Sequence, residues 1–257
     1  MFKKSILSLL GLFAVVNTQS SYAEKQELIK IRADEWCPYN CQPGSNDPGY
    51  MIEVLQMTFG KKNIDYQTMN WSRAILETRK NKYDGIVGAS IENAPDFIFS
   101  VPVGESKNCF YKKNTSQFKY TGIDSLNSVQ LGVIKDYTYF NELEVYIKKN
   151  IRDKKKLDEH YGNNAQDRLI LKLELGRLDT FVEDPSVVSY MMKKHPDIKD
   201  IVDAGCVKTG SLYIAFSPNN PKSKDRKNRL THTIAKMIKS GDMDKLLAKY
   251  GAKPWYK

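Results

Sequence analysis

Strand and helix patterns alternate along the first part of this 257-residue chain, and this alternation constrains the fold more than any single motif. Residues 28–33 and 64–69 have the pattern of β-strands, and residues 83–89 form a short apolar run typical of a buried parallel strand. Between them, residues 50–59 and 71–79 place apolar side chains at helical spacing. The order β-α-β-α-β predicts the α/β class, with a parallel sheet covered by helices.

The same pattern returns more weakly in the rest of the chain. Strands are predicted at residues 129–134, 180–183 and 211–217, and helices at residues 142–151, 165–176, 186–194, 225–239 and 243–250. Pro185 fits the first position of one helix, and Gly176 fits the end of another. No low-complexity linker is found, so we expect two α/β units of similar size.

The first 23 residues are predicted to be a secretory signal peptide that is not part of the fold. Lys3 and Lys4 precede an apolar stretch at residues 6–16, and Ser21 and Ala23 place small side chains at the two cleavage-determining positions. The alternative is a short buried helix. We expect cleavage after Ala23 and a periplasmic location. No apolar run reaches the roughly 20 residues of a membrane-spanning helix, which argues against an integral membrane protein.

Export into an oxidising compartment changes how the four cysteines are interpreted. Four cysteines allow three pairings. Cys37 and Cys41 stand close enough to close a tight loop, which would leave Cys109 to pair with Cys206. A thiol oxidoreductase acting through Cys37 and Cys41 is an alternative, although their spacing is one residue longer than in the redox motif of glutaredoxins. The three histidines are scattered, so we predict no metal site.

The charge balance argues against nucleic acid as a partner. The chain has 40 Lys and Arg against 30 Asp and Glu, a formal net charge of +10. This excess is spread along the chain, and runs such as residues 154–156 are typical of a solvated loop. No segment has the pattern of a nucleic-acid-binding module.

Short landmarks follow one another in a characteristic order along the mature chain. They are Asp34 before Pro38-Tyr39, Gly49-Tyr50 at a helix start, Trp71 at the next helix start, residues 82–85, residues 99–102, residues 175–179, Asp184-Pro185, and residues 240–251. In this order and spacing, nearly the whole mature chain resembles the bacterial extracytoplasmic solute-binding proteins of family 3, the polar amino-acid type.

This resemblance implies a type II periplasmic-binding-protein fold, in which two sheets with flanking helices form two lobes joined by two crossing strands. We expect lobe 1 at residues 24–105 and 212–257, and lobe 2 at residues 106–211. A ligand would lie between the lobes at the carboxyl ends of strands, and hinge motion would close the lobes on it. No cofactor is expected.

The resemblance and the local sequence together indicate eight candidate ligand-binding residues. They are Asp34, Trp36, Tyr39, Trp71, Arg73, Ser90, Tyr137 and Asp184. In the family, an aromatic side chain flanks the ligand, and an Asp at the place of Asp184 accepts hydrogen bonds from the α-ammonium group. The alternatives are a helix N-cap for Asp184, core packing for Trp71 and a turn for Ser90.

The chain departs from the family pattern where an Arg normally binds the α-carboxylate. Residues 90–96 contain no basic residue, and Asp136-Tyr137 replaces a Gly-Thr turn. Arg73 could supply a bidentate clamp from another direction. Its alternative is a surface Arg, or one paired with Glu77. The ligand could therefore be an amino acid, a small carboxylate or an amine.

We therefore predict a non-catalytic, monomeric periplasmic protein that captures a small polar solute in its interlobe cleft. Its partner would be the permease of an ABC importer or a membrane sensor. The alternative is a secreted enzyme on the same fold, similar to the cyclohexadienyl dehydratases, in which Glu92 or Asp184 would act as acid or base.

Overall fold

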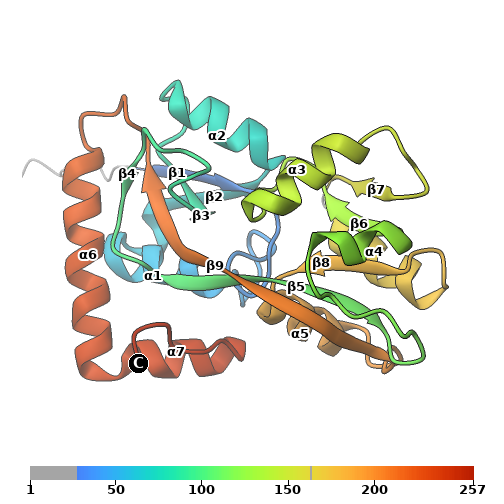
Figure 1. Cartoon of the computed structure of the whole chain (residues 1–257). Helices are drawn as coiled ribbons and strands as arrows, with labels where there is room; N and C mark the ends of the chain where they lie inside the picture. The colour runs from blue at the N-terminus through green and yellow to red at the C-terminus, as the bar shows by residue number, and fades with distance from the viewer. Residues whose placement is uncertain (1–27, 163) are drawn as a thin grey trace, which may run out of the picture.

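The alternating strands and helices form two lobes that lie side by side, shown by a computed structural model that describes residues 28–162 and 164–257 (Figure 1). The first lobe contains both the beginning and the end of the described chain. Its elements are β1 (Ile29–Ala33), α1 (Tyr50–Phe59), η1 (Lys61–Asn63), β2 (Ile64–Thr68), α2 (Trp71–Arg79), β3 (Gly85–Ala89), β4 (Ile98–Phe99), α6 (Ser223–Ser240) and α7 (Asp242–Tyr250).

The second lobe is formed by the middle of the chain. Its elements are η2 (Ile123–Ser128), β6 (Leu131–Ile134), α3 (Asn141–Asn150), β7 (Leu157–His160), α4 (Ala165–Glu174), β8 (Thr180–Glu183) and α5 (Pro185–Lys194). The long strands β5 (Gly104–Lys113) and β9 (Ile201–Phe216) run from one lobe into the other (Figure 1). The expected two-lobed α/β fold is confirmed, while the lobe boundaries at residues 105/106 and 211/212 stay predictions.

The strands pair in the continuous order β2-β1-β3-β9-β5-β8-β6-β7, with β4 also paired to β9. In the first lobe β1 pairs in parallel with β2 and β3, and in the second lobe β6 pairs in parallel with β7 and β8. Strand β9 is antiparallel to β3 at one end and to β5 along the rest of its length. The two sheets expected from the sequence therefore share one hydrogen-bonded path through the crossing strands.

The sequence patterns locate most elements, but of the two crossing strands that the resemblance implied they indicate only the end of one. The strand predicted at residues 211–217 is the final part of β9, and β5, β7 and the short β4 were not predicted. Strand β5 reads GESKNCFYKK, and after the buried Gly104 its first half carries polar side chains at exposed and half-buried positions. This part of β5 crosses between the lobes outside the hydrophobic core. It therefore lacks the apolar alternation that indicates a strand.

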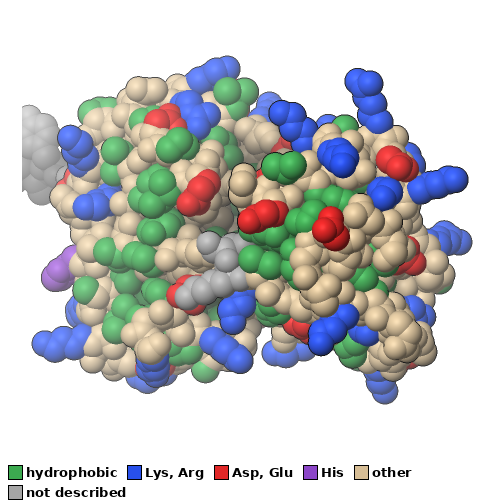
Figure 2. All heavy atoms as spheres, in the orientation of Figure 1, with side chains coloured by type: hydrophobic (Ala, Val, Ile, Leu, Met, Phe, Trp, Pro, Cys, Tyr) green, Lys and Arg blue, Asp and Glu red, His purple; other side chains and the backbone are tan. Residues whose placement is uncertain are grey.

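The buried apolar side chains form two clusters, and the larger one extends through both lobes. Helix α1 buries Met51, Val54 and Leu55, which belong to the large core cluster. A smaller cluster that includes Phe110 and Leu131 lies within the second lobe. On the face shown in Figure 2, Lys and Arg side chains stand around the edges of both lobes and do not gather into one patch.

Both disulfides that the sequence favoured are present. Cys37 pairs with Cys41, and Cys109 pairs with Cys206. Cys109 lies opposite Cys206 in the ladder, so the second bond links β5 to β9. Asp203 lies close to this pair, but both sulfurs are in the disulfide and are not thiolate ligands for a metal. Within residues 28–162 and 164–257, no cysteine is free for the oxidoreductase chemistry considered above.

The predicted signal peptide, residues 1–23, lies outside the described residues. Among the helices of the described part of the chain, none combines the length and the apolar character needed to cross a membrane.

Candidate functional site

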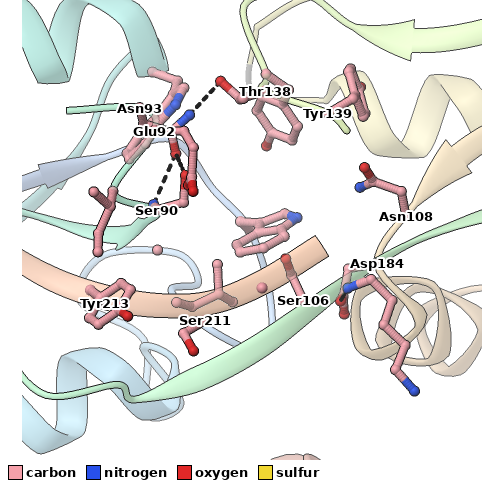
Figure 3. A pocket seen from close by; sticks show the side chains of 18 of the residues that line it. Ser90, Glu92, Asn93, Ser106, Asn108, Thr138, Tyr139, Asp184, Ser211 and Tyr213 are labelled. Atoms are coloured by element: carbon pink, nitrogen blue, oxygen red, sulfur yellow. Dashed lines mark hydrogen bonds between the residues drawn. The ribbon is translucent and has the colours of Figure 1, made fainter. Parts of the chain in front are cut away.

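A cavity of about 400 Å³ lies where the carboxyl ends of four strands meet between the lobes. Asp34 follows β1, Ser90 follows β3, and Tyr137 lies just after β6. Glu183 ends β8, and Asp184 follows it. Parallel strands of α/β folds place their ligand-binding groups at this edge. Figure 3 shows Ser90 and Asn93 on one side of the cavity and Asn108 and Asp184 on the other.

Hydrogen bonds connect the two lobes around this cavity. Trp36 donates its indole N–H to Glu183 Oε1 at 3.1 Å. Asn93 donates to the hydroxyl of Thr138, and Tyr137 donates to Asp34. Because each bond joins one lobe to the other, the structure represents a closed arrangement of the cleft.

The loop after β1 holds Trp36 and Tyr39 in place by its own backbone. The carbonyl oxygen of Trp36 accepts from the N–H groups of Tyr39 and Asn40, at 3.0 and 3.1 Å. The rings of Trp36 and Tyr39 stack with their centroids 4.3 Å apart. Gly88 has a φ of +76°, and a Cβ there would lie 3.3 Å from the Trp36 ring, so a glycine suits the close approach of Trp36 to β3.

Replacing Gly49 by Ala should destabilise this loop strongly. Gly49 has a φ of +100°, and an added Cβ would lie 2.5 Å from the Tyr39 carbonyl oxygen and from Asn40 Cα. Both are backbone atoms that cannot rotate away, so we expect a loss of about 3 kcal/mol or more in the free energy of unfolding. Urea unfolding monitored by circular dichroism would measure it.

Gly44 provides a matched control for this substitution. Gly44 has a φ of +76°, but an added Cβ would meet no atom within 4 Å. Gly44→Ala should therefore cost only the backbone strain of about 1 kcal/mol. Equal losses for Gly44→Ala and Gly49→Ala would contradict the steric explanation.

Glu183 is a buried carboxyl group with one unsatisfied oxygen. Its Oε1 accepts from the Trp36 indole and from the backbone N–H of Asp184 at 2.8 Å. Its Oε2 is buried and has no hydrogen-bond partner. Burial raises the pKa of Glu183 to about 8, helped by the neighbouring charges of Asp184 and Asp34.

Asp184 differs from Glu183 because the protein already satisfies both of its oxygens. Its Oδ1 accepts from the Tyr39 hydroxyl at 2.9 Å and from the backbone N–H of Ser186 at 2.8 Å. Its Oδ2 accepts from the backbone N–H of Lys107 at 3.0 Å. Asp184 is thus the N-cap of α5, as its alternative role proposed, and it also lines the cavity, while its contact with a ligand stays a prediction.

Asp34 and Tyr137 form a second polar contact between the lobes. Tyr137 donates to Asp34 and accepts from the amide of Gln166 at 2.9 Å. Burial raises the pKa of Asp34 to about 6, although the bond from Tyr137 acts in the opposite direction. The cavity therefore contains three carboxyl groups whose pKa values are raised chiefly by burial, namely those of Asp34, Glu183 and Asp184.

Most of the candidate residues lie together around the cavity. Six of the eight line it: Asp34, Trp36, Trp71, Ser90, Tyr137 and Asp184. Tyr39 is buried with only 2% of its surface exposed, and it reaches Asp184 from outside the lining. Arg73 is an exposed residue of α2 that does not line the cavity.

Sequence reasoning did not select several lining residues, including Glu183, Asn93, Lys107 and Tyr213. Glu183 had a recognisable signal, because it is a charged residue at the end of a buried apolar strand. Asn93 accepts from both the N–H and the hydroxyl of Ser90, so it occupies the donors that Ser90 was expected to offer a ligand. Lys107 belongs to β5, which the sequence patterns did not predict, and Tyr213 belongs to the predicted part of β9 but was not selected as a site residue.

Comparison with known proteins adds a family relationship to this geometry. A family model described as "Bacterial extracellular solute-binding proteins, family 3" matches residues 29–253. The lysine/arginine/ornithine-binding periplasmic protein of Escherichia coli (strain K12) is 24% identical over 258 residues, covering 96% of each chain.

Solved structures show the same fold at low sequence identity. An ancestral arginine-binding protein bound to arginine matches with a TM-score of 0.68 and 18% identity, over 88% of this chain and 98% of that one. A histidine kinase sensor domain with similarity to periplasmic binding proteins matches with a TM-score of 0.71 and 15% identity, over 89% and 99% of the two chains.

Proposed function

We propose, from the premise that the chain belongs to the bacterial extracellular solute-binding proteins of family 3, that it captures an amino acid or a related small amine or carboxylate between its lobes. It would present this ligand to the permease of an ABC importer or to a membrane sensor. The similar proteins include both an amino-acid-binding periplasmic protein and a sensor domain. Both a permease and a membrane sensor are therefore proposed as candidate partners. Closure on the ligand would be the signal that the partner recognises.

The observation that carries the proposal is the cavity between the hydrogen-bonded lobes. Its volume of about 400 Å³ is suited to a small molecule, and it combines aromatic walls with convergent polar groups. Trp36, Trp71 and Tyr137 provide aromatic surface, and Asp34 and Asp184 provide carboxylates. We propose these residues and Ser90 as the binding set, with Tyr39 supporting Asp184.

The signal peptide would be cleaved after Ala23, and the mature protein would act as a periplasmic monomer without catalytic activity. Lobe 1 would comprise residues 24–105 and 212–257, and lobe 2 residues 106–211.

Ligand binding should raise the stability of the purified protein. A ligand at about 100 times its dissociation constant adds roughly 2.7 kcal/mol to the free energy of unfolding. A thermal-shift screen of protein freed from carried-over ligand, against amino acids, small carboxylates, amines and prephenate, should therefore give at least one clear rise in melting temperature. No rise in any of these classes would refute the proposed ligand range.

Two controls make the screen specific. Turnover of prephenate would contradict the non-catalytic proposal and support a dehydratase. Arg73→Lys should leave the affinity for the best ligand unchanged, because Arg73 is exposed and does not line the cavity. A marked loss of affinity in this variant would instead restore Arg73 as a bidentate clamp.

A further inference from the structure

The charged side chains that line the cavity are predominantly acidic. Asp34, Glu92, Glu183 and Asp184 contribute carboxyl groups, whereas Lys107 is the only basic residue in the lining that the structure describes. Glu183 and Asp184 are almost fully buried, with 4% and 3% of their surfaces exposed, and Lys107 is exposed. A buried carboxyl group that ionises beside a bound ammonium group interacts with it more strongly than an exposed charge does, so the lining favours a cation.

Glu183 is the buried carboxyl group with an oxygen that can still accept a hydrogen bond from a ligand. The oxygens of Asp184 accept hydrogen bonds from Tyr39, Lys107 and Ser186, as described above. Glu183 Oε2, in contrast, is buried in the cavity lining without a partner. A buried acceptor without a donor is costly, and an N–H group of a ligand would satisfy it.

The lining offers fewer groups that suit a ligand carboxylate. The N–H and hydroxyl donors of Ser90 are both directed to Asn93 Oδ1, at 3.0 and 3.1 Å (Figure 3). No Arg lines the cavity within the described residues, so no bidentate clamp is available there. The neighbouring carboxyl groups would repel a second negative charge, which is a common way in which sites reject a wrong ligand.

The aromatic side chains of the lining suit a cationic ligand that also has an aliphatic chain. Trp36 and Tyr137 stand edge to face with ring centroids 6.4 Å apart, and both line the cavity. Trp71 and Tyr213 also line it. Aromatic faces attract ammonium groups and cover methylene chains at the same time.

From these contacts we infer that the ligand is a small aliphatic amine without a carboxylate, with its ammonium group bound by Glu183. This inference rests on the proposed function and narrows its ligand class. It differs from recognition of a cationic amino acid because the carboxylate is not only unnecessary but unfavourable. The structure thus predicts that an amine binds more tightly than the amino acid from which it is formed by decarboxylation.

Matched ligand pairs test this order directly. Isothermal titration calorimetry of the refolded, ligand-free protein would compare lysine with cadaverine, ornithine with putrescine and arginine with agmatine. We expect the amine to bind at least about tenfold more tightly in one pair or more. Glu183→Gln should weaken binding of that amine by about 30-fold or more, because the ammonium group loses its charged partner.

Glu142→Gln is the matched control for the change in net charge, because Glu142 is an exposed residue of α3 outside the cavity lining. It should leave amine affinity within about twofold of wild type. An equal loss in Glu142→Gln and Glu183→Gln would show that net charge alone attracts the amine, and would overturn the assignment of Glu183.

Proton exchange on binding gives a second readout that does not depend on a variant. An ammonium group beside Glu183, with Asp34, Asp184 and Lys107 nearby, lowers the pKa of Glu183, so binding near pH 7 should release a proton. A carboxylate bound at the same place would favour protonated Glu183 and would not release one. Titrations in buffers of different ionisation enthalpy measure this exchange.

The outcomes separate this inference from the proposed function. Tight binding of lysine, ornithine or arginine with weak binding of the matching amine would overturn the inference and leave the proposed function intact. Binding of an amine without proton release, and unaffected by Glu183→Gln, would overturn the role of Glu183. Binding of neither amines nor amino acids nor small carboxylates would overturn the inference together with the proposed ligand range.

Discussion

The ligand-free protein should become less stable by several kcal/mol as the pH rises from about 5 to about 8. The unfolded chain ionises its Glu side chains near their ordinary pKa of 4.5, whereas burial raises the pKa of Glu183 in the folded protein to about 8. Between these two values the folded state holds a proton that the unfolded state has lost. Stability therefore falls as the pH rises through this window, and for Glu183 alone the full effect is on the order of 5 kcal/mol.

Other titrating groups contribute with different signs in the same window. Asp34 acts in the same direction as Glu183 between about pH 4 and 6, because burial raises its pKa to about 6. His160 opposes them, since burial lowers its pKa and the unfolded state takes up a proton first as the pH falls. Asp158 and Asp167 have lowered pKa values, so their stabilising contribution is complete above about pH 4 and constant across the window.

The difference between wild type and Glu183→Gln isolates the contribution of Glu183. Urea unfolding at intervals from about pH 5 to 8 would give the slope of stability against pH for each protein. Glu183→Gln should remove much of the decline, and Glu142→Gln should keep it. A Glu183→Gln variant with the wild-type slope would show that Glu183 ionises normally in the folded protein.

The alternation of strands and helices was sufficient to predict the fold because each element buries its own apolar face. Helix α1 was predicted at its observed bounds, Tyr50–Phe59, from apolar residues at helical spacing. Helix α5 begins at Pro185, as its sequence indicated. The resemblance implied two crossing strands, but β5 and the first part of β9 have no strand pattern of their own, because the parts that cross between the lobes are polar and half exposed.

The candidate site was predictable where a residue follows a recognisable strand. Ser90 was selected because it follows a buried strand, whereas Asp34 and Asp184 were selected from the family resemblance, and all three line the cavity. The hydrogen-bond partners could not be predicted, because they depend on contacts between distant segments. The bond from Tyr39 to Asp184 spans 145 positions, and the donors of Ser90 are occupied by a side chain from the same turn.

Replacing Asp184 by Ala should destabilise the protein by about 3 kcal/mol. The change removes the N-cap of α5, which costs about 1 kcal/mol. It also removes the acceptor of the Lys107 N–H and the shortest hydrogen bond of the buried Tyr39 hydroxyl, which keeps only the longer bonds to the Glu105 carbonyl oxygen at 3.3 Å and to Ser186 at 3.5 Å. A buried donor left without an acceptor costs about 1–3 kcal/mol. Relief of the buried charge offsets part of this loss, since burial raises the pKa of Asp184.

Asp179→Ala is the matched control, because Asp179 also accepts a backbone N–H, that of Gln130, but at an exposed position. Water can replace that acceptor, so we expect a loss below about 1 kcal/mol in the same urea unfolding experiment. Equal losses for Asp179→Ala and Asp184→Ala would contradict the view that burial makes the Asp184 contacts costly to remove.

Asp184→Asn separates the structural role of Asp184 from a role in binding the ligand. The Asn carbonyl oxygen can still cap α5, so this variant should keep more stability than Asp184→Ala. If Asp184 acts mainly as an internal acceptor and Glu183 binds the ammonium group, Asp184→Asn should also keep most of the affinity for the amine. A stable Asp184→Asn protein that loses affinity by about 2–5 kcal/mol would instead make Asp184 the charged partner of the ligand.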